Sequence, residues 1–158
     1  MRTNLGRSLS VLVVTLIAVF APLGAQASSC SAGSVAGNWA YTYTGTIFTP
    51  SGALPAASVG HFTLNSSGDV TGSQARTVAG QSGVEDISGT VSVSSDCTAS
   101  ATIKVFVNDQ LQRTAELALA FDSNGKHVRM IFQSLTLPDS TNVPVVITID
   151  GNKVTYKE

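Results

Sequence analysis

Residues 97–122 read CTASATIKVFVNDQLQRTAELALAFD, and this stretch decides the fold class. Apolar residues occupy nearly every second position on both sides of the Asn108-Asp109 pair. Strict alternation indicates a β-strand with one buried and one wet face, and Asn and Asp favour the tight turns that join such strands. Since parallel strands are typically continuous apolar runs, the stretch predicts an antiparallel hairpin.

The same alternation recurs along most of the chain after residue 27. Strands are predicted at 38–48, 58–64, 70–78, 87–94, 97–108, 111–122, 127–136, 143–149 and 153–157. Turn signals separate them, including 80–83 and 150–152, and two proline-containing loops are predicted at 49–57 and 137–142. No stretch after residue 27 has helical periodicity. The pattern predicts an all-β, antiparallel up-and-down meander that closes into an eight- or nine-stranded barrel, with a β-sandwich as the alternative.

The first 27 residues have the three zones of a secretory signal peptide. Arg2 and Arg7 give a positive start, residues 9–20 are almost entirely apolar, and Ala25-Gln26-Ala27 is the small-x-small pattern that signal peptidase reads. The apolar run is short for a membrane span, so a retained anchor is the less favoured alternative. We predict a signal peptide at 1–27, one barrel domain at 28–158, and a secreted or periplasmic protein.

Charge and composition argue against several classes of partner. Cleavage leaves seven basic residues (nine less Arg2 and Arg7) against ten acidic ones, a formal charge of −3. Nucleic-acid binding calls for a basic stripe with aromatic platforms, and the sequence has neither. No basic amphipathic segment follows residue 27, so we expect neither nucleic-acid binding nor membrane insertion after cleavage.

The two cysteines, Cys30 and Cys97, both follow the predicted cleavage point. In an oxidising compartment an even pair predicts a disulfide, here one that pins the N-terminal tail to the barrel. The alternative is that Cys30 is a lipidated N-terminus, which would leave Cys97 as a free thiol. Two cysteines alone do not make a zinc site, so we expect no metal and no cofactor.

Gly37-Asn38-Trp39 resembles the Gly-x-Trp signature of lipocalins and the wider calycin barrels. The resemblance implies a closed barrel whose tryptophan plugs one end, with Lys153 or Lys157 packed over it. Three further stretches resemble a group of small exported bacterial proteins of unassigned function, and they lie at 59–64, 67–72 and 95–102. That resemblance implies a barrel and carries over no catalytic residue.

The sequence offers no recognisable catalytic set. His61 and His127 are expected at the surface or in a turn, and no serine lies at the centre of a Gly-x-Ser-x-Gly elbow. Alternation sends the side chains of Glu85 and Asp86, the only adjacent carboxylates, to opposite faces of a strand. We therefore expect that the protein is not an enzyme.

Polar side chains on the apolar side of two strands are the one anomaly. Gln74 and Arg76 share their side with Val70 and Val78, and Arg113 shares its side with Leu117 and Phe121. A charge inside a barrel is costly unless it is paired or meets an anionic ligand. One interpretation makes Arg76 and Arg113 anchors for an acidic apolar ligand such as a fatty acid, in a site completed by Gln74, Tyr41 and Tyr43. The other places both arginines near strand ends, where long side chains reach water.

Three functional hypotheses follow. The first is a carrier or sensor that binds a small apolar or acidic-lipid ligand inside the barrel. The second is a packed barrel that acts as an envelope interaction or structural module through its surface. The third, an enzyme, is the least favoured, because no acid, base or nucleophile set is visible.

Overall fold

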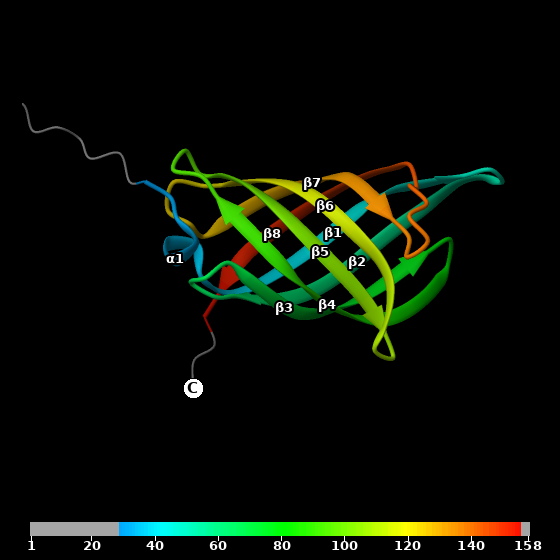
Figure 1. Cartoon of the computed structure of the whole chain (residues 1–158), viewed down its shortest axis with the longest axis horizontal. Helices are drawn as coiled ribbons and strands as arrows, with labels where there is room; N and C mark the ends of the chain where they lie inside the picture. The colour runs from blue at the N-terminus through cyan, green and yellow to red at the C-terminus, as the bar shows by residue number, and fades with distance from the viewer. Residues whose placement is uncertain (1–28, 156–158) are drawn as a thin grey trace, which may run out of the picture.

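Eight β-strands and one short helix make up the chain in its computed structural model, which describes residues 29–155. The elements are α1 (Ala32–Val35), β1 (Gly37–Thr49), β2 (Gly52–Leu64), β3 (Asp69–Val78), β4 (Gln81–Val93), β5 (Thr98–Val107), β6 (Gln110–Phe121), β7 (His127–Thr136) and β8 (Val145–Val154). Every strand pairs antiparallel with its neighbours in sequence, and β8 pairs with β1 to close the barrel (Figure 1). The predicted up-and-down barrel is confirmed, with eight strands, and the sandwich alternative is wrong.

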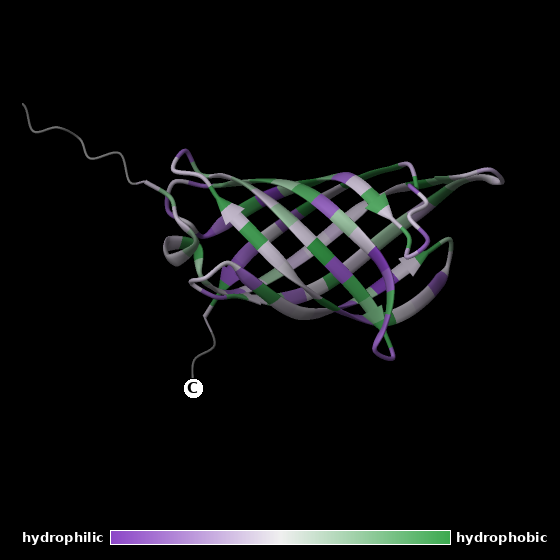
Figure 2. Ribbon diagram, in the orientation of Figure 1, coloured by the Kyte–Doolittle hydropathy of each residue, from purple (hydrophilic) through white to green (hydrophobic). Residues whose placement is uncertain are grey.

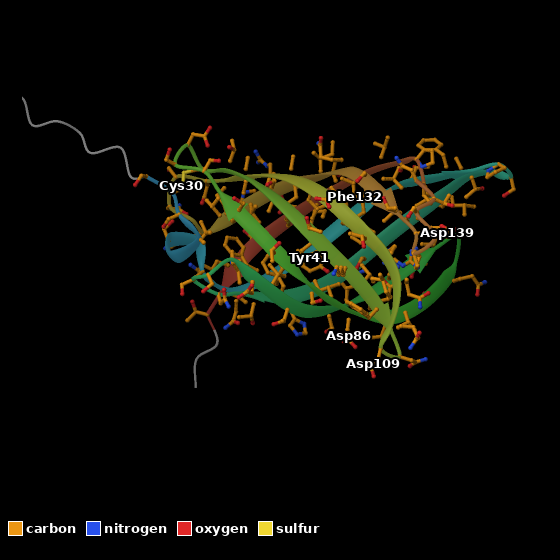
Figure 3. All side chains as sticks on the ribbon, in the orientation of Figure 1. Cys30, Tyr41, Asp86, Asp109, Phe132 and Asp139 are labelled. Carbon is orange, nitrogen blue, oxygen red and sulfur yellow. A yellow bond between two sulfur atoms is a disulfide. The ribbon has the colours of Figure 1, made fainter. Side chains whose placement is uncertain are left out.

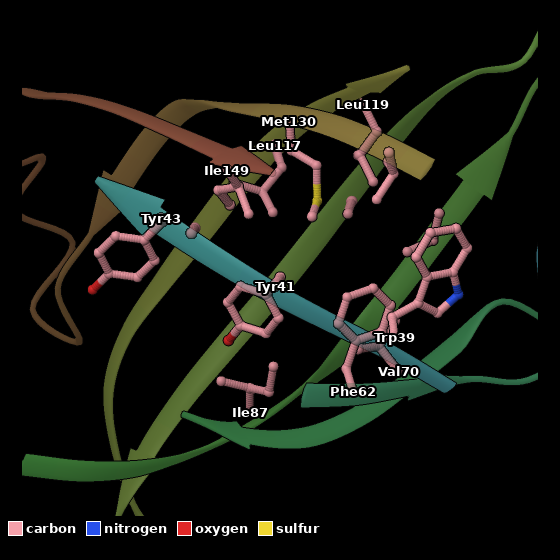
Figure 4. Packing of buried hydrophobic residues seen from close by; sticks show 14 of the residues in the cluster. Trp39, Tyr41, Tyr43, Phe62, Val70, Ile87, Leu117, Leu119, Met130 and Ile149 are labelled. Atoms are coloured by element: carbon pink, nitrogen blue, oxygen red, sulfur yellow. The ribbon is translucent and has the colours of Figure 1, made fainter. Parts of the chain in front are cut away.

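Hydropathy alternates along each strand because inward side chains form the core and outward ones meet water. Figure 2 shows this as bands of green and purple or white along the ribbons. Aromatic side chains of β1, among them Trp39, Tyr41 and Tyr43, point into this core (Figure 4). The buried hydrophobic residues of the described part of the chain form one contiguous cluster inside the barrel.

The predicted loop at 49–57 is wrong. β1 and β2 continue as a long hairpin whose turn is only Pro50-Ser51. Pro55 lies within β2, and its carbonyl accepts a hydrogen bond from the Ala79 amide just past the end of β3. Since a residue's N–H and C=O point to the same side of a strand, the missing N–H faces a position beyond the β3 ladder, where proline is tolerated.

The predicted turn at Asp150-Gly151-Asn152 is also wrong, because these residues lie in the middle of β8. Gly151 pairs with Tyr41 on β1. A Cβ atom at Gly151 would lie 2.9 Å from Val128 Cγ1, so glycine serves close packing here rather than a turn. The two strands predicted at 143–149 and 153–157 are therefore one strand, and residues 156–158 lie outside the described part of the chain.

Strand β4 begins at Gln81, well before the predicted start at Ile87. The turn before it is Ala79-Gly80, both with positive φ, rather than residues 80–83. The sequence pattern did not predict the first part of β4, because Val84 faces solvent, 73 % exposed, while Glu85 faces the interior, 5 % exposed. This inverted pattern places the Glu85 carboxylate inside the barrel.

Helix α1 and Trp39 close one end of the barrel. Ser31 caps the helix through a capping box with Ser34, and Val35 is fully buried. The indole N–H of Trp39 donates to the Val35 carbonyl at 3.1 Å. The predicted packing of a late basic residue over the tryptophan is confirmed for Lys153, whose Nζ lies 6.0 Å from the ring centroid.

Glycine at position 37 follows from the same packing. Its φ is +144°, and a Cβ atom there would lie 2.5 Å from Lys153 Cε. A side chain would therefore displace the lysine from the tryptophan as well as strain the backbone. The Gly-x-Trp pattern thus has a local physical reason in this chain.

The predicted disulfide is confirmed: Cys30 and Cys97 are bonded, and they join the segment before α1 to the turn between β4 and β5. The Cys30 amide also donates to the Ser95 carbonyl at 3.2 Å. Because lipidation needs the same sulfur atom, the bond argues against a lipidated Cys30. A disulfide is consistent with an extracellular or periplasmic location. The predicted signal peptide at 1–27 lies outside the described residues.

Replacing both cysteines, Cys30→Ser with Cys97→Ser, is expected to lower the free energy of unfolding by about 4 kcal/mol. The reason is the long loop that the bond closes, with a sequence separation of 67 residues. Urea denaturation of the oxidised chain, the reduced chain and the double variant measures this. Equal midpoints for all three would show that the bond does not stabilise the fold.

Candidate functional site

Two adjacent cross-strand rows place polar side chains inside the barrel, toward the end opposite α1. The first row is Tyr41, Gly60, Gln74 and Glu85, on β1 to β4. The second row, nearer the open end, is Tyr43, Ser58, Arg76 and Gly83 on the same strands. Arg113 reaches this cluster from β6 on another part of the wall. These side chains meet because alternation gives each pair in a row the same inward direction.

Glu85 is the centre of a buried polar network. Arg113 holds it with two hydrogen bonds, Nη1 to Oε1 at 2.9 Å and Nη2 to Oε2. Arg76 Nε lies 3.0 Å from Oε1, and Gln74 Nε2 donates to Oε2 at 2.7 Å. Oε2 therefore accepts two hydrogen bonds, and Oε1 accepts one from Arg113 and has an ion-pair contact with Arg76, so neither oxygen of this buried carboxylate lacks a partner.

Gln74 links this carboxylate to the tyrosine side of the barrel. Its Oε1 accepts from the Tyr41 hydroxyl at 2.8 Å and from the Ser58 hydroxyl at 3.1 Å. Gly60 makes the first bond sterically feasible, because a Cβ atom there would lie 2.8 Å from the Tyr41 hydroxyl. Among the described residues, no buried side-chain nitrogen or oxygen is left without a hydrogen-bond partner.

Electrostatics keep the network in one ionisation state near neutral pH. Burial raises the pKa of Glu85, but hydrogen bonds from Arg113 and Gln74 and the two guanidinium charges outweigh it, so the pKa lies below its ordinary value. Burial raises the pKa of Tyr41 well above that of free tyrosine, and it raises the pKa of Tyr43 as well. Two guanidinium groups against one carboxylate give the cluster a net charge of +1.

An apolar cavity runs along the barrel axis beside this network. Its volume is about 60 Å³, counted as the space that the centre of a water molecule can reach. That exceeds the roughly 10–15 Å³ that one water molecule needs. Polar contacts come from Tyr41, Tyr43, Gln74 and Arg113, and the remaining wall is aliphatic and aromatic, including Phe62, Phe121 and Phe132. Figure 4 shows part of this wall from close by, and Figure 3 places Tyr41 and Phe132 within the barrel.

The structure brings the five predicted site residues together. Tyr41, Tyr43, Gln74 and Arg113 line the cavity, and Arg76 joins them through Glu85. Neither interpretation of the arginines anticipated their first partner, since both guanidinium groups contact a carboxylate of the protein itself. Glu85 was missed, although extending the alternation of Ile87 back by two residues assigns it to the interior.

The remaining candidate groups lie outside the cavity. His61 is exposed on the outer face, and Nε2 of His127 lies 2.9 Å from Asp150 Oδ2. Glu85 and Asp86 face opposite sides of β4, as predicted. Within residues 29–155 no group of three or more His, Cys, Asp or Glu side chains is arranged to hold a metal ion, and no helix is long and apolar enough to cross a membrane.

The fold and the plugged end define the class: an eight-stranded, closed antiparallel barrel that is compatible with a calycin-like fold. No family model matches the chain, and no curated protein matches it in sequence. The predicted resemblance to small exported bacterial proteins therefore stays a prediction.

Proposed function

We propose that this chain is an exported binding protein that holds a small, mostly apolar ligand with one acidic group inside the barrel. The observation that carries the proposal is the contact between an apolar cavity and a buried cluster of net charge +1. A cavity with a mostly apolar wall favours an apolar body, and the guanidinium charge that no second carboxylate balances favours one anionic group. The disulfide supports a location outside the cytoplasm, and binding alone is proposed, without catalysis.

In this proposal the two arginines have different roles. Arg113 lines the cavity, but its guanidinium is already committed to Glu85 by two hydrogen bonds. Arg76 contacts Glu85 through Nε and is partly exposed toward the open end, so its terminal amino groups retain donors for a ligand. The acidic group of the ligand therefore lies near Tyr43 and Arg76, with its apolar part directed toward Trp39.

Titration calorimetry with hexanoate and decanoate, against hexanol and decanol, tests this proposal. We expect the acids to bind more tightly than the alcohols. Arg76→Met should lower affinity for the acids by about tenfold or more, because a hydrogen bond to a charged group contributes roughly 1.5–3 kcal/mol. Affinity for the alcohols should not change. Equal affinities for acids and alcohols, unchanged by Arg76→Met, would contradict an acidic group on the ligand. No binding of any of the four compounds would contradict a ligand site inside the barrel.

A row of exposed apolar residues favours a second candidate, the surface interaction module. Val59, Ala75 and Val84 are direct neighbours across β2, β3 and β4 and all face solvent. Val59 and Val84 are 60 % and 73 % exposed. In this alternative the barrel wall binds another protein and the cavity stays empty. Loss of partner binding on Val59→Ser with Val84→Ser, with fatty-acid titrations that show no binding, would favour it.

A further inference from the structure

The β1–β2 hairpin extends beyond the strands on both sides of it. Pairing of β1 with β8 ends at Ile47, and pairing of β2 with β3 begins at Ala56, so residues 48–55 form an overhang. Figure 1 shows this tip reaching farthest at the end opposite α1. Two hydrogen bonds fix its base, from the Phe48 amide to the Pro144 carbonyl and from the Ala79 amide to the Pro55 carbonyl, each 2.9 Å.

The overhang is apolar and uncharged. It carries Phe48, 44 % exposed, and the partly exposed Leu54, on opposite faces. Residues 37–68 contain no Asp, Glu, Lys or Arg, and Figure 2 draws the tip in pale and green tones. Leu137, 37 % exposed, follows β7 at the same end of the barrel. The rim at this end of the barrel therefore offers large apolar side chains, two of them on a projecting hairpin.

We propose that the overhang docks the open end of the barrel onto a lipid surface by inserting Phe48 and Leu54. The absence of charge across the hairpin favours an apolar phase over a charged protein partner. A partner that adds a β-strand is disfavoured, because Pro55 and Pro50 lack the N–H groups that such pairing uses. The mode differs from a basic amphipathic segment, which the sequence does not contain.

α1 and Trp39 close the other end of the barrel, so in this proposal an apolar acid enters the cavity from the docked end. That role as a loading route rests on the proposed function, whereas the docking itself does not. Asp109 and Asp139 lie in the turns of this rim, so anionic lipid should not strengthen binding. Binding should also be insensitive to salt.

Flotation of the purified chain with phosphatidylcholine vesicles tests the inference. The wild type should float with the vesicles, and Phe48→Ser with Leu54→Ser should lose at least about tenfold in partitioning. The matched control is Val59→Ser with Val84→Ser, which removes two more exposed apolar side chains from the barrel wall and should float like the wild type.

Several results would overturn the inference: a wild type that does not float, equal loss in the control, or flotation only with phosphatidylglycerol vesicles. Self-association that the tip variant abolishes, without vesicle binding, would assign the overhang to a second copy of the chain. The tip variant should bind decanoate like the wild type in lipid-free solution. A failure of vesicle binding is thereby separated from a failure of the ligand site.

Discussion

The Arg113→Met variant is expected to lose about 3–5 kcal/mol of unfolding free energy, because it leaves Glu85 buried without its two-fold hydrogen-bonded partner. Arg76, which binds Glu85 through a single contact and is partly exposed, cannot replace that partner. Replacing both members with apolar residues, Arg113→Met with Glu85→Leu, should recover most of the loss, since no buried charge is then left unpaired. Arg76→Met is the milder control.

Urea denaturation of the wild type, Arg113→Met, Glu85→Leu and the double variant, analysed as a double-mutant cycle, measures this coupling. The pH dependence gives a second readout. Because the pKa of Glu85 is lowered in the folded state, its stabilising contribution is present above the ordinary carboxyl pKa and is lost as pH falls through the lowered value. The double replacement should remove that part of the acid sensitivity. If Arg113→Met and the double variant have equal free energies of unfolding, an unpaired Glu85 charge is not the cause of the lost stability.

The Trp39→Ala variant is expected to lose about 3–5 kcal/mol of unfolding free energy, because the substitution leaves a cavity in the core. Trp39 is fully buried, stacks on Phe62 at a centroid distance of 6.0 Å and meets the edge of Phe121 at 5.6 Å. The change also leaves the Val35 carbonyl without its indole donor, so α1 loses a hydrogen bond to the barrel.

Thermal unfolding followed by circular dichroism measures this loss, and Trp39→Phe should fall between the wild type and Trp39→Ala. The exposed Phe48→Ala change is a control that should cost less than about 0.5 kcal/mol. A Trp39→Ala loss below about 1 kcal/mol would mean that the plugged end does not stabilise the fold. Trp39 is the single tryptophan, so wild-type fluorescence also reports on this end of the barrel.

Strand alternation predicted the barrel because each strand has one buried face, and that constraint acts on nearly every residue. The prediction from alternation failed where a local contact, rather than the buried face of the strand, determines the residue type. Gly151 looks like a turn residue, but it lies within β8, where the absence of a side chain makes room for Val128 of β7. Pro55 looks like a loop residue, but it lies in β2 where no strand pairs with its missing N–H.

The candidate site was half predictable for a related reason. Arg76, Gln74 and Arg113 violate the apolar pattern inside strands that were recognised, so they stood out. Glu85 lies in the first part of β4, where Val84 faces solvent and the hydropathy is inverted, so that part was not recognised as a strand. Buried charged residues interrupt the apolar–polar alternation by which strands are predicted. Such residues are concentrated at the candidate site, so the prediction is weakest there.

The most direct test of a ligand site inside the barrel is an NMR titration of the chain with decanoate, observed at side-chain methyl groups. We predict that shifts concentrate on methyl groups that line the cavity, such as those of Leu117, Met130 and Ile149, while Val59 and Val84 on the outer wall stay unchanged. Shifts confined to the outer wall, or no shifts at any concentration that keeps decanoate monomeric, would contradict the account.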